Sequence, residues 1–185
     1  MREALEQDLK NLHGLKNSLD AHRLVQLAKR FYEARRIVIL AGDLAAILAD
    51  YLDYQITLLG LPVFTATTAG RIAHLVRTVS PRDLVLAISF RRGLRQTVEG
   101  VNLARDRTAY CVGITDTFVS PLARECDEVF LASVESTSFG ASYAAPVALV
   151  NAILAACGQY RRPQTLAILK EIAEEQRKGF RWYTL

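Results

Sequence analysis

The chain is poor in the residues that build disulfide frameworks, metal sites and nucleotide cradles. It has three cysteines and three histidines in 185 residues. Cys111, Cys126 and Cys157 are widely separated and form no Cys-x-x-Cys pair, so free thiols in a reducing cytoplasm are expected and no metal site is indicated. Neither a P-loop nor a Gly-x-Gly-x-x-Gly fingerprint is present, which disfavours nucleotide and dinucleotide binding and indicates no cofactor.

Targeting and membrane-spanning signals are also lacking. Residues 1–12 are charged and amphipathic, without the apolar core of a signal peptide. Residues 136–160 carry no charge and are long enough to cross a bilayer, but Pro146 and Asn151 interrupt them. We therefore expect a cytoplasmic protein with no membrane attachment, in which this stretch is a helix of the core or of a subunit interface.

The charge is mild. A net charge of +4 and a pI near 9.1 fall short of a dedicated nucleic-acid binder, and they suit attraction of a small anion equally well. Hydrophobic residues make up 51% of the chain and charged residues 23%, an ordinary globular composition with enough apolar side chains for a sizeable core.

Short apolar runs alternate with helical patterns. Helices are predicted over 3–13, 21–34, 43–59, 69–79, 95–107, 139–157 and 164–178, and strands over 36–42, 62–65, 84–89, 108–115 and 128–132. This alternation predicts an α/β fold, a three-layer αβα sandwich around a five-stranded parallel sheet, for which we assume the flavodoxin-like order 2-1-3-4-5. We expect residues 1–35 to be a helical lead-in, residues 36–185 the main domain, and the aromatic tail at 180–183 to dock on the protein.

Residues 83–97 contain the strongest candidate for a binding site. The apolar run Leu84–Ile88 ends in Ser89, and a loop with Arg91, Arg92 and Arg95 leads into a helix. Guanidinium groups, backbone N–H groups and a helix N-terminus all attract an anion, although a merely solvated basic loop is the alternative. With the order 2-1-3-4-5, ligands bind between the first and third strands, and loops 41–45 and 89–97 form the walls.

Other candidates are weaker. Asp43 suits an N-cap of the helix that follows, or an acceptor for a sugar hydroxyl. The hydroxyls of Ser133–Ser138 either cap the next helix or face the ligand, and Glu135 is the one acid there that could act as a base. The residues predicted to contact a ligand are Ser89, Arg91, Arg92, Gly93, Arg95, Thr97, Gly42, Asp43, Ser136 and Ser138.

Several runs resemble a known family. They are Arg36-Ile-Val-Ile-Leu-Ala-Gly42, Leu86-Ala-Ile-Ser-Phe-Arg-Arg-Gly-Leu-Arg-Gln-Thr97, Gly113-Ile-Thr-Asp116, Val119-Ser-Pro-Leu-Ala123 and Cys126-Asp-Glu-Val-Phe-Leu131. Together they resemble the sugar-isomerase (SIS) domain, and more narrowly the sensor half of RpiR-type transcriptional regulators. The helices before residue 36 also resemble those that precede this domain. The resemblance implies a five-stranded parallel sheet, phosphosugar binding, and dimers with sites near the subunit interface.

Two loops depart from the family pattern. The first commonly reads Gly-x-Gly-x-Ser, whereas this chain has Ala41-Gly-Asp-Leu-Ala45. The second commonly reads Ser-x-Ser-Gly-x-Thr; Ser89 matches the first serine, Arg91 replaces the second, and Gly93 comes one place late. The departures imply a guanidinium cradle in place of a hydroxyl one.

Three functions are weighed. The favoured one is a non-catalytic phosphosugar sensor, a homodimer or higher oligomer that acts on DNA only through a helix-turn-helix domain absent from this chain. The alternative is a phosphosugar aldose–ketose isomerase, in which Glu135, Asp43 or a histidine would supply the base. Direct nucleic-acid binding is the weakest, because the charge is modest and no binding motif is present.

Overall fold

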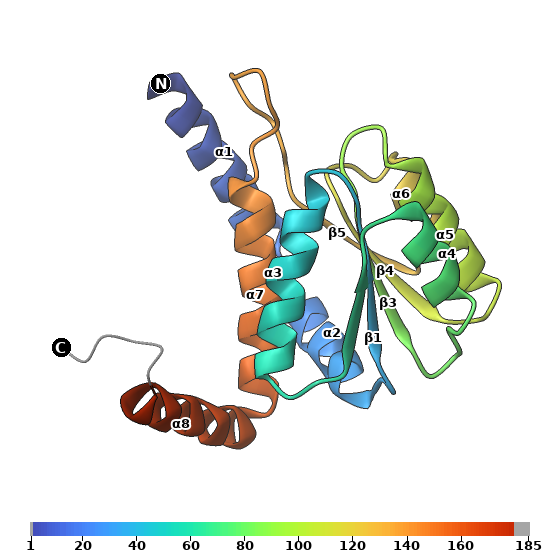
Figure 1. Ribbon diagram of the computed structural model, residues 1–185. Helices are drawn as coiled ribbons and strands as arrows, with labels where there is room; N and C mark the ends of the chain where they lie inside the picture. Colours follow the sequence, from blue (N-terminus) through green and yellow to red (C-terminus); the bar gives the residue numbers. More distant parts are fainter. Residues whose placement is uncertain (1, 180–185) are drawn as a thin grey trace.

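The computed structural model describes residues 2–179, and a parallel five-stranded sheet forms its centre (Figure 1). The sheet order is β2-β1-β3-β4-β5 with every pair parallel, which confirms the predicted topology. The neighbouring strands β1 and β3 are buried along their whole length, as their unbroken apolar sequences predict. The strands are β1 (Ile37–Leu40), β2 (Val63–Ala66), β3 (Leu84–Ile88), β4 (Tyr110–Thr115) and β5 (Glu128–Leu131).

Helices cover both faces of the sheet because alternate strand residues point to opposite sides. Ile37 and Ile39 belong to the core beneath α1 (Arg2–Ser18), α2 (Ala21–Glu33), α3 (Ala45–Leu58) and α7 (Ala144–Tyr160). Val38 and Leu40 belong to the core beneath α4 (Ala69–Val76), α5 (Arg95–Arg105) and α6 (Pro121–Glu125). The last helix, α8 (Arg162–Lys178), projects from the end of α7 (Figure 1).

The two N-terminal helices are part of the core. Leu24, Leu27 and Phe31 of α2 are buried against the sheet and α7, and Leu15 of α1 joins the same cluster. The predicted lead-in thus packs closely on the rest of the chain, and its division from the main domain at residue 35 stays a prediction.

Some predicted boundaries differ from those observed. α1 runs through Gly14, where a break was expected, because Asn11 and Leu15 are buried and hold this part of the helix against the body. α3 begins at Ala45 instead of Asp43, and α7 begins at Ala144 instead of 139. The aromatic tail at 180–183 lies outside the described residues.

The uncharged stretch that prompted a membrane check is largely helix α7. Leu149, Val150 and Ile153 are fully buried, and the helix packs against α1, α2 and α3. Within residues 2–179, no helix is both long and apolar enough to cross a bilayer.

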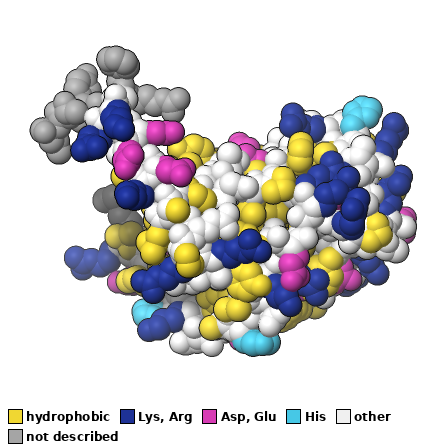
Figure 2. Space-filling view, turned by 90° about the horizontal axis from the view of Figure 1, so that it is seen from below, with side chains coloured by type: hydrophobic (Ala, Val, Ile, Leu, Met, Phe, Trp, Pro, Cys, Tyr) yellow, Lys and Arg dark blue, Asp and Glu magenta, His cyan; other side chains and the backbone are white. Residues whose placement is uncertain are grey.

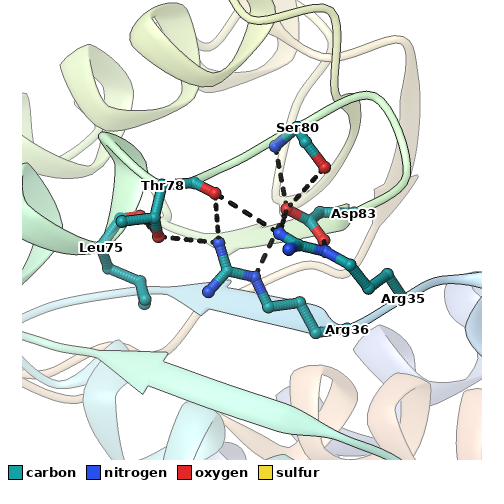
Figure 3. A network of polar contacts seen from close by, with 6 residues as sticks. All are labelled: Arg35, Arg36, Leu75, Thr78, Ser80 and Asp83. Atoms are coloured by element: carbon teal, nitrogen blue, oxygen red, sulfur yellow. Dashed lines mark hydrogen bonds and ion pairs between the residues drawn. The ribbon is translucent and has the colours of Figure 1, made fainter.

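An ion-pair network ties β1 to the turn before β3 at the amino edge of the sheet (Figure 3). Asp83, whose side chain is fully buried, accepts hydrogen bonds from Arg35 Nε at 2.8 Å and Arg35 Nη2 at 2.7 Å. It also accepts a bond from the backbone N–H of Ser80 at 2.9 Å, and Arg36 Nε lies 3.4 Å away. Burial alone would raise the pKa of Asp83, but these bonds and charges outweigh it and hold the pKa below its usual value.

Candidate functional site at the carboxyl edge of the sheet

The loops after β1 and β3 lie in close contact at the carboxyl edge. A Cβ atom on Gly42 would be 2.4 Å from Leu94 Cδ2 and 2.8 Å from Gln96 Nε2, distances that side chains do not tolerate without moving. Glycine at position 42 therefore lets the two loops approach. The strand order places these loops side by side, as the sequence predicts.

Internal bonds shape the loop between β3 and α5. Ser89 is 4% exposed, and its Oγ accepts a hydrogen bond from the backbone N–H of Leu94 at 2.8 Å. Gly93 has φ 73°, a left-handed conformation that glycine adopts without strain, and its N–H donates to the carbonyl of Phe90 at 3.2 Å. Ser89 thus holds the loop in shape, and α5 begins at an N-cap, Leu94, that has no capping side chain.

Two residues at this edge have left-handed backbones although neither is a glycine. Asp43 has φ 53° and Arg91 has φ 58°, and Arg91 N–H donates to Asp116 Oδ1 at 2.8 Å. Such conformations cost about 1 kcal/mol or more and gather at functional sites. The left-handed backbone also explains why Asp43 is not the helix cap expected from sequence: Leu44 holds that position.

Tyr143 adds a hydroxyl to the same region. Its ring packs edge-on against Phe90, with 5.4 Å between ring centroids. Burial and the charge of Asp43 raise the pKa of Tyr143 to about 12, Arg91 opposes the rise, and Asp116 adds to it. The phenol is therefore neutral at physiological pH and can donate a hydrogen bond to a ligand.

Sequence reasoning named neither Phe90, Asp116 nor Tyr143 as a site residue. Asp116 had a usable signal, because it directly follows β4, the strand that pairs with β3. No sequence signal pointed to Tyr143, since it precedes α7 and lies far along the chain from the arginine loop.

The arginines of the loop differ in whether they form an ion pair. Within residues 2–179, Arg91 and Arg92 form no ion pair, and both are exposed. Arg95 instead donates to Glu99 Oε1 at 2.7 Å on the outer surface of α5. Thr97 is fully buried, and its hydroxyl has no partner among the described residues. Arg91 and Arg92 are therefore the two cations of the loop that are free to meet an anion.

The loop after β5 is attached to α1. Asn11 Nδ2 donates to the carbonyl of Glu135 at 2.8 Å, and Ser142 Oγ donates to Asp8 Oδ1 at 2.5 Å. The backbone N–H of Ser138 donates to Ser136 Oγ, so these serines bond to their own loop and do not cap α7. The side chain of Glu135 is exposed. In Figure 1 this loop rises beside α1, away from the arginine loop.

The cysteines and histidines lie apart from this site. Burial is the main cause that raises the pKa of Cys111, Cys126 and Cys157 to about 12 each, so these free thiols stay protonated and unreactive. The histidines, His13, His22 and His74, are exposed on helices α1, α2 and α4.

Comparisons with known proteins agree with this geometry. The sugar isomerase domain of an RpiR transcription factor from Sphaerobacter thermophilus superposes with a TM-score of 0.86 and 25% identity, over 92% of this chain and 96% of the other. The Vibrio vulnificus NanR protein, solved with ManNAc-6P, superposes with a TM-score of 0.84 and 18% identity, over 96% of this chain and 69% of the other.

A third similar structure belongs to a hypothetical protein of Methanococcus jannaschii, inferred to be a 3-hexulose-6-phosphate isomerase. It gives a TM-score of 0.65 and 16% identity over 98% of both chains. A search among curated proteins gave no match. The SIS domain family matches residues 30–157, which is more than half of the sequence. The chain belongs to the SIS domain family.

Proposed function

We propose that this chain is a non-catalytic phosphosugar-sensing domain of the RpiR type. The observation that carries the proposal is the pair of exposed arginines, Arg91 and Arg92, which have no ion pair within residues 2–179 and lie where a doubly wound sheet binds ligands. The likeness to the RpiR domain and to NanR, which was solved with ManNAc-6P, supports the same ligand class.

The surroundings suit a sugar that carries a phosphate. The phosphate would meet Arg91, Arg92 and the uncapped N-terminus of α5, where backbone N–H groups and the helix dipole favour an anion. The sugar hydroxyls would meet the carboxylates of Asp43 and Asp116. A ligand with both features would use the whole site, whereas an inorganic anion would use only its basic part.

An isomerase is the second candidate, favoured by the likeness to the Methanococcus jannaschii protein. Isomerisation needs a base that moves a proton between adjacent carbons. The backbone carbonyl of Glu135 is bonded to Asn11 of α1, which keeps its loop away from the arginine loop of the same chain. Glu135 would therefore have to act on the ligand of a second copy. Although two carboxylates, Asp43 and Asp116, lie at this edge, the sensor remains the better supported function because the RpiR domain and NanR are the more similar structures by TM-score.

We also propose that the chain forms a dimer through α3 and α7. Exposed apolar residues follow one stripe of α3 at spacings of three and four, and Val147 of α7 lies 38% exposed. Tyr51 links the two helices by donating to Asn151 Oδ1 at 2.8 Å. Such a stripe on a stable helix is typical of a helix-packing interface. The exposed residues of the α3 stripe are Leu44, Ile47, Tyr51 and Tyr54.

Sedimentation tests the dimer. The protein is expected to be a dimer at micromolar concentration, and Ile47→Glu should shift it to a monomer because a charge would be buried at the interface. Leu103→Glu, on the exposed side of α5, is the matched control and should leave the dimer intact. A monomeric parent protein would refute the proposed dimer.

A panel of sugar phosphates tests the function itself. Thermal-shift measurements should show stabilisation by at least one phosphosugar and little by the matching free sugar, because the anion supplies much of the binding energy. Each ligand found is then assayed for aldose–ketose isomerisation. No turnover is expected; turnover that Glu135→Gln abolishes would establish the isomerase and overturn the sensor.

A further inference from the structure

A basic hollow lies at the amino edge of the sheet, opposite the arginine loop. It has a volume of about 450 Å³ and lies between the end of α2, the turn before β3 and the start of β4. Figure 2 looks onto this edge and shows many Lys and Arg side chains over the part of the molecule that holds α4 and α5. The charged residues that line the hollow are Arg30, Glu33, Arg35, Arg82 and Asp83.

The acids of the hollow are already neutralised. Asp83 is buried and paired with Arg35 and Arg36. Glu33 Oε1 lies 3.7 Å from Lys29 Nζ, one turn back on α2. The remaining cations of the hollow, Arg30 and Arg82, form no ion pair within residues 2–179, so three arginines face two carboxylates that already have cationic partners.

The guanidinium groups are also held in place. Arg30 stacks on the ring of Tyr110, with its central carbon 3.6 Å from the ring centroid, which leaves its N–H edges unblocked by the ring. Arg35 is clamped by Asp83 through Nε and Nη2, and its Nη1 has no partner among the described residues (Figure 3). Groups that are fixed before binding lose less entropy when an anion arrives.

We propose that this hollow is a second anion site that takes a phosphoryl group through Arg30, Arg35 and Arg82. Arginine suits phosphate because its planar fork can donate two parallel hydrogen bonds. The phosphoryl group could belong to a free phosphorylated metabolite or to a nucleic-acid backbone. The proposal does not depend on the carboxyl-edge site, which lies at the other end of the strands.

Calorimetry with pyrophosphate tests the site in a protein whose first site is disabled by Arg91→Gln and Arg92→Gln. In that background, one pyrophosphate is expected to bind, and adding Arg30→Gln and Arg82→Gln should weaken binding at least 10-fold. Lys10→Gln and Lys16→Gln on α1 remove the same net charge and should leave the affinity unchanged. Equal weakening by the control pair would mean that net charge alone attracts pyrophosphate, and would overturn the site.

Two further measurements separate a loss of binding from a loss of folding and identify the source of the phosphoryl group. Arg82→Gln alone removes a side chain without described contacts, so it should weaken pyrophosphate binding at an unchanged melting temperature. A duplex DNA arm identifies the source: duplex binding that is weakened by Arg30→Gln and Arg82→Gln points to nucleic acid, and pyrophosphate binding without duplex binding points to a metabolite. If neither probe binds in the disabled background, the site does not exist.

Discussion

The Asp83 network and the arginine loop, at opposite edges of the sheet, use charge in opposite ways. In the Asp83 network, the buried carboxylate accepts hydrogen bonds from Arg35 and Ser80, and Arg36 Nε lies 3.4 Å away as a second cation. At the carboxyl edge, Arg91 is exposed with a left-handed backbone and no ion pair within residues 2–179. A buried carboxylate that is paired and hydrogen-bonded stabilises the fold, whereas strained and unpaired groups cost stability and are retained where a ligand binds. Mutations of Asp83 and of the arginine loop should therefore separate stability from sugar-phosphate binding.

The largest effect is expected from Arg91→Ala with Arg92→Ala. Each charged hydrogen bond to a phosphate contributes about 1.5–3 kcal/mol, so the pair should cost about 3 kcal/mol or more of binding, roughly 100-fold in Kd. The free energy of unfolding should change little, because neither side chain has an ion pair within residues 2–179. Calorimetry with the best sugar phosphate and urea denaturation measure the two quantities. Unchanged affinity would remove these arginines from the site.

Asp83→Asn should give the reverse pattern. It leaves Arg35 and the largely buried Arg36 without their anion, which should cost about 2–3 kcal/mol of unfolding free energy. This lies below the range for fully buried pairs because the Arg35 side chain is 43% exposed and solvent screens its charge. Urea denaturation measures the loss, and ligand affinity at the carboxyl edge should stay within twofold.

Acid provides an independent check on Asp83. Because its pKa is lower in the folded protein than in the unfolded chain, the network contributes stability above the unfolded pKa, and that contribution is lost as the pH falls through the folded value. Below about pH 5, the unfolding free energy should therefore fall more steeply with decreasing pH in the parent protein than in Asp83→Asn. Parallel curves would show that the ion pairs contribute little.

The same contrast explains what the sequence could predict. Unbroken apolar runs such as Ile37–Leu40 and Leu84–Ile88 predict buried parallel strands. The order 2-1-3-4-5, assumed from other doubly wound folds, is confirmed and brings the loops of Gly42 and Ser89 together. The backbone conformation of Asp43 could not be predicted, since an aspartate before a helix is typical of an N-cap. Contacts between distant segments, such as Tyr143 against Phe90, depend on packing that no local pattern encodes.

Gly42→Ala tests whether the two carboxyl-edge loops act together. The added methyl group would overlap the ends of the Leu94 and Gln96 side chains, which must rotate away and so loosen the packing between the two loops. Overpacking of this kind costs about 1–2 kcal/mol of stability. Binding should weaken as well, although no ligand contact is removed. Gly70→Ala is the matched control, because nothing lies within 4 Å of its added carbon.

The smallest expected effect is on stability, when the strained backbones of Asp43 and Arg91 are each relieved by glycine. Glycine adopts left-handed backbones freely, so Asp43→Gly should raise the unfolding free energy by about 0.5 kcal/mol, and Arg91→Gly by about 1 kcal/mol, because aspartate tolerates this conformation better than arginine. The bond from residue 91 N–H to Asp116 survives in both variants.

Both glycine variants should bind the sugar phosphate less tightly although both are more stable, and Arg91→Gly should lose more affinity because it removes the cation. Urea denaturation and calorimetry on the same samples give the two values. Stability gained together with unchanged affinity would show that the strain serves no ligand, and a matching gain in stability from Asp83→Asn would erase the difference between the arginine loop and the Asp83 network. The opposite signs expected here, more stable and weaker in binding, are what distinguish the ligand-binding arginine loop from the structural Asp83 network.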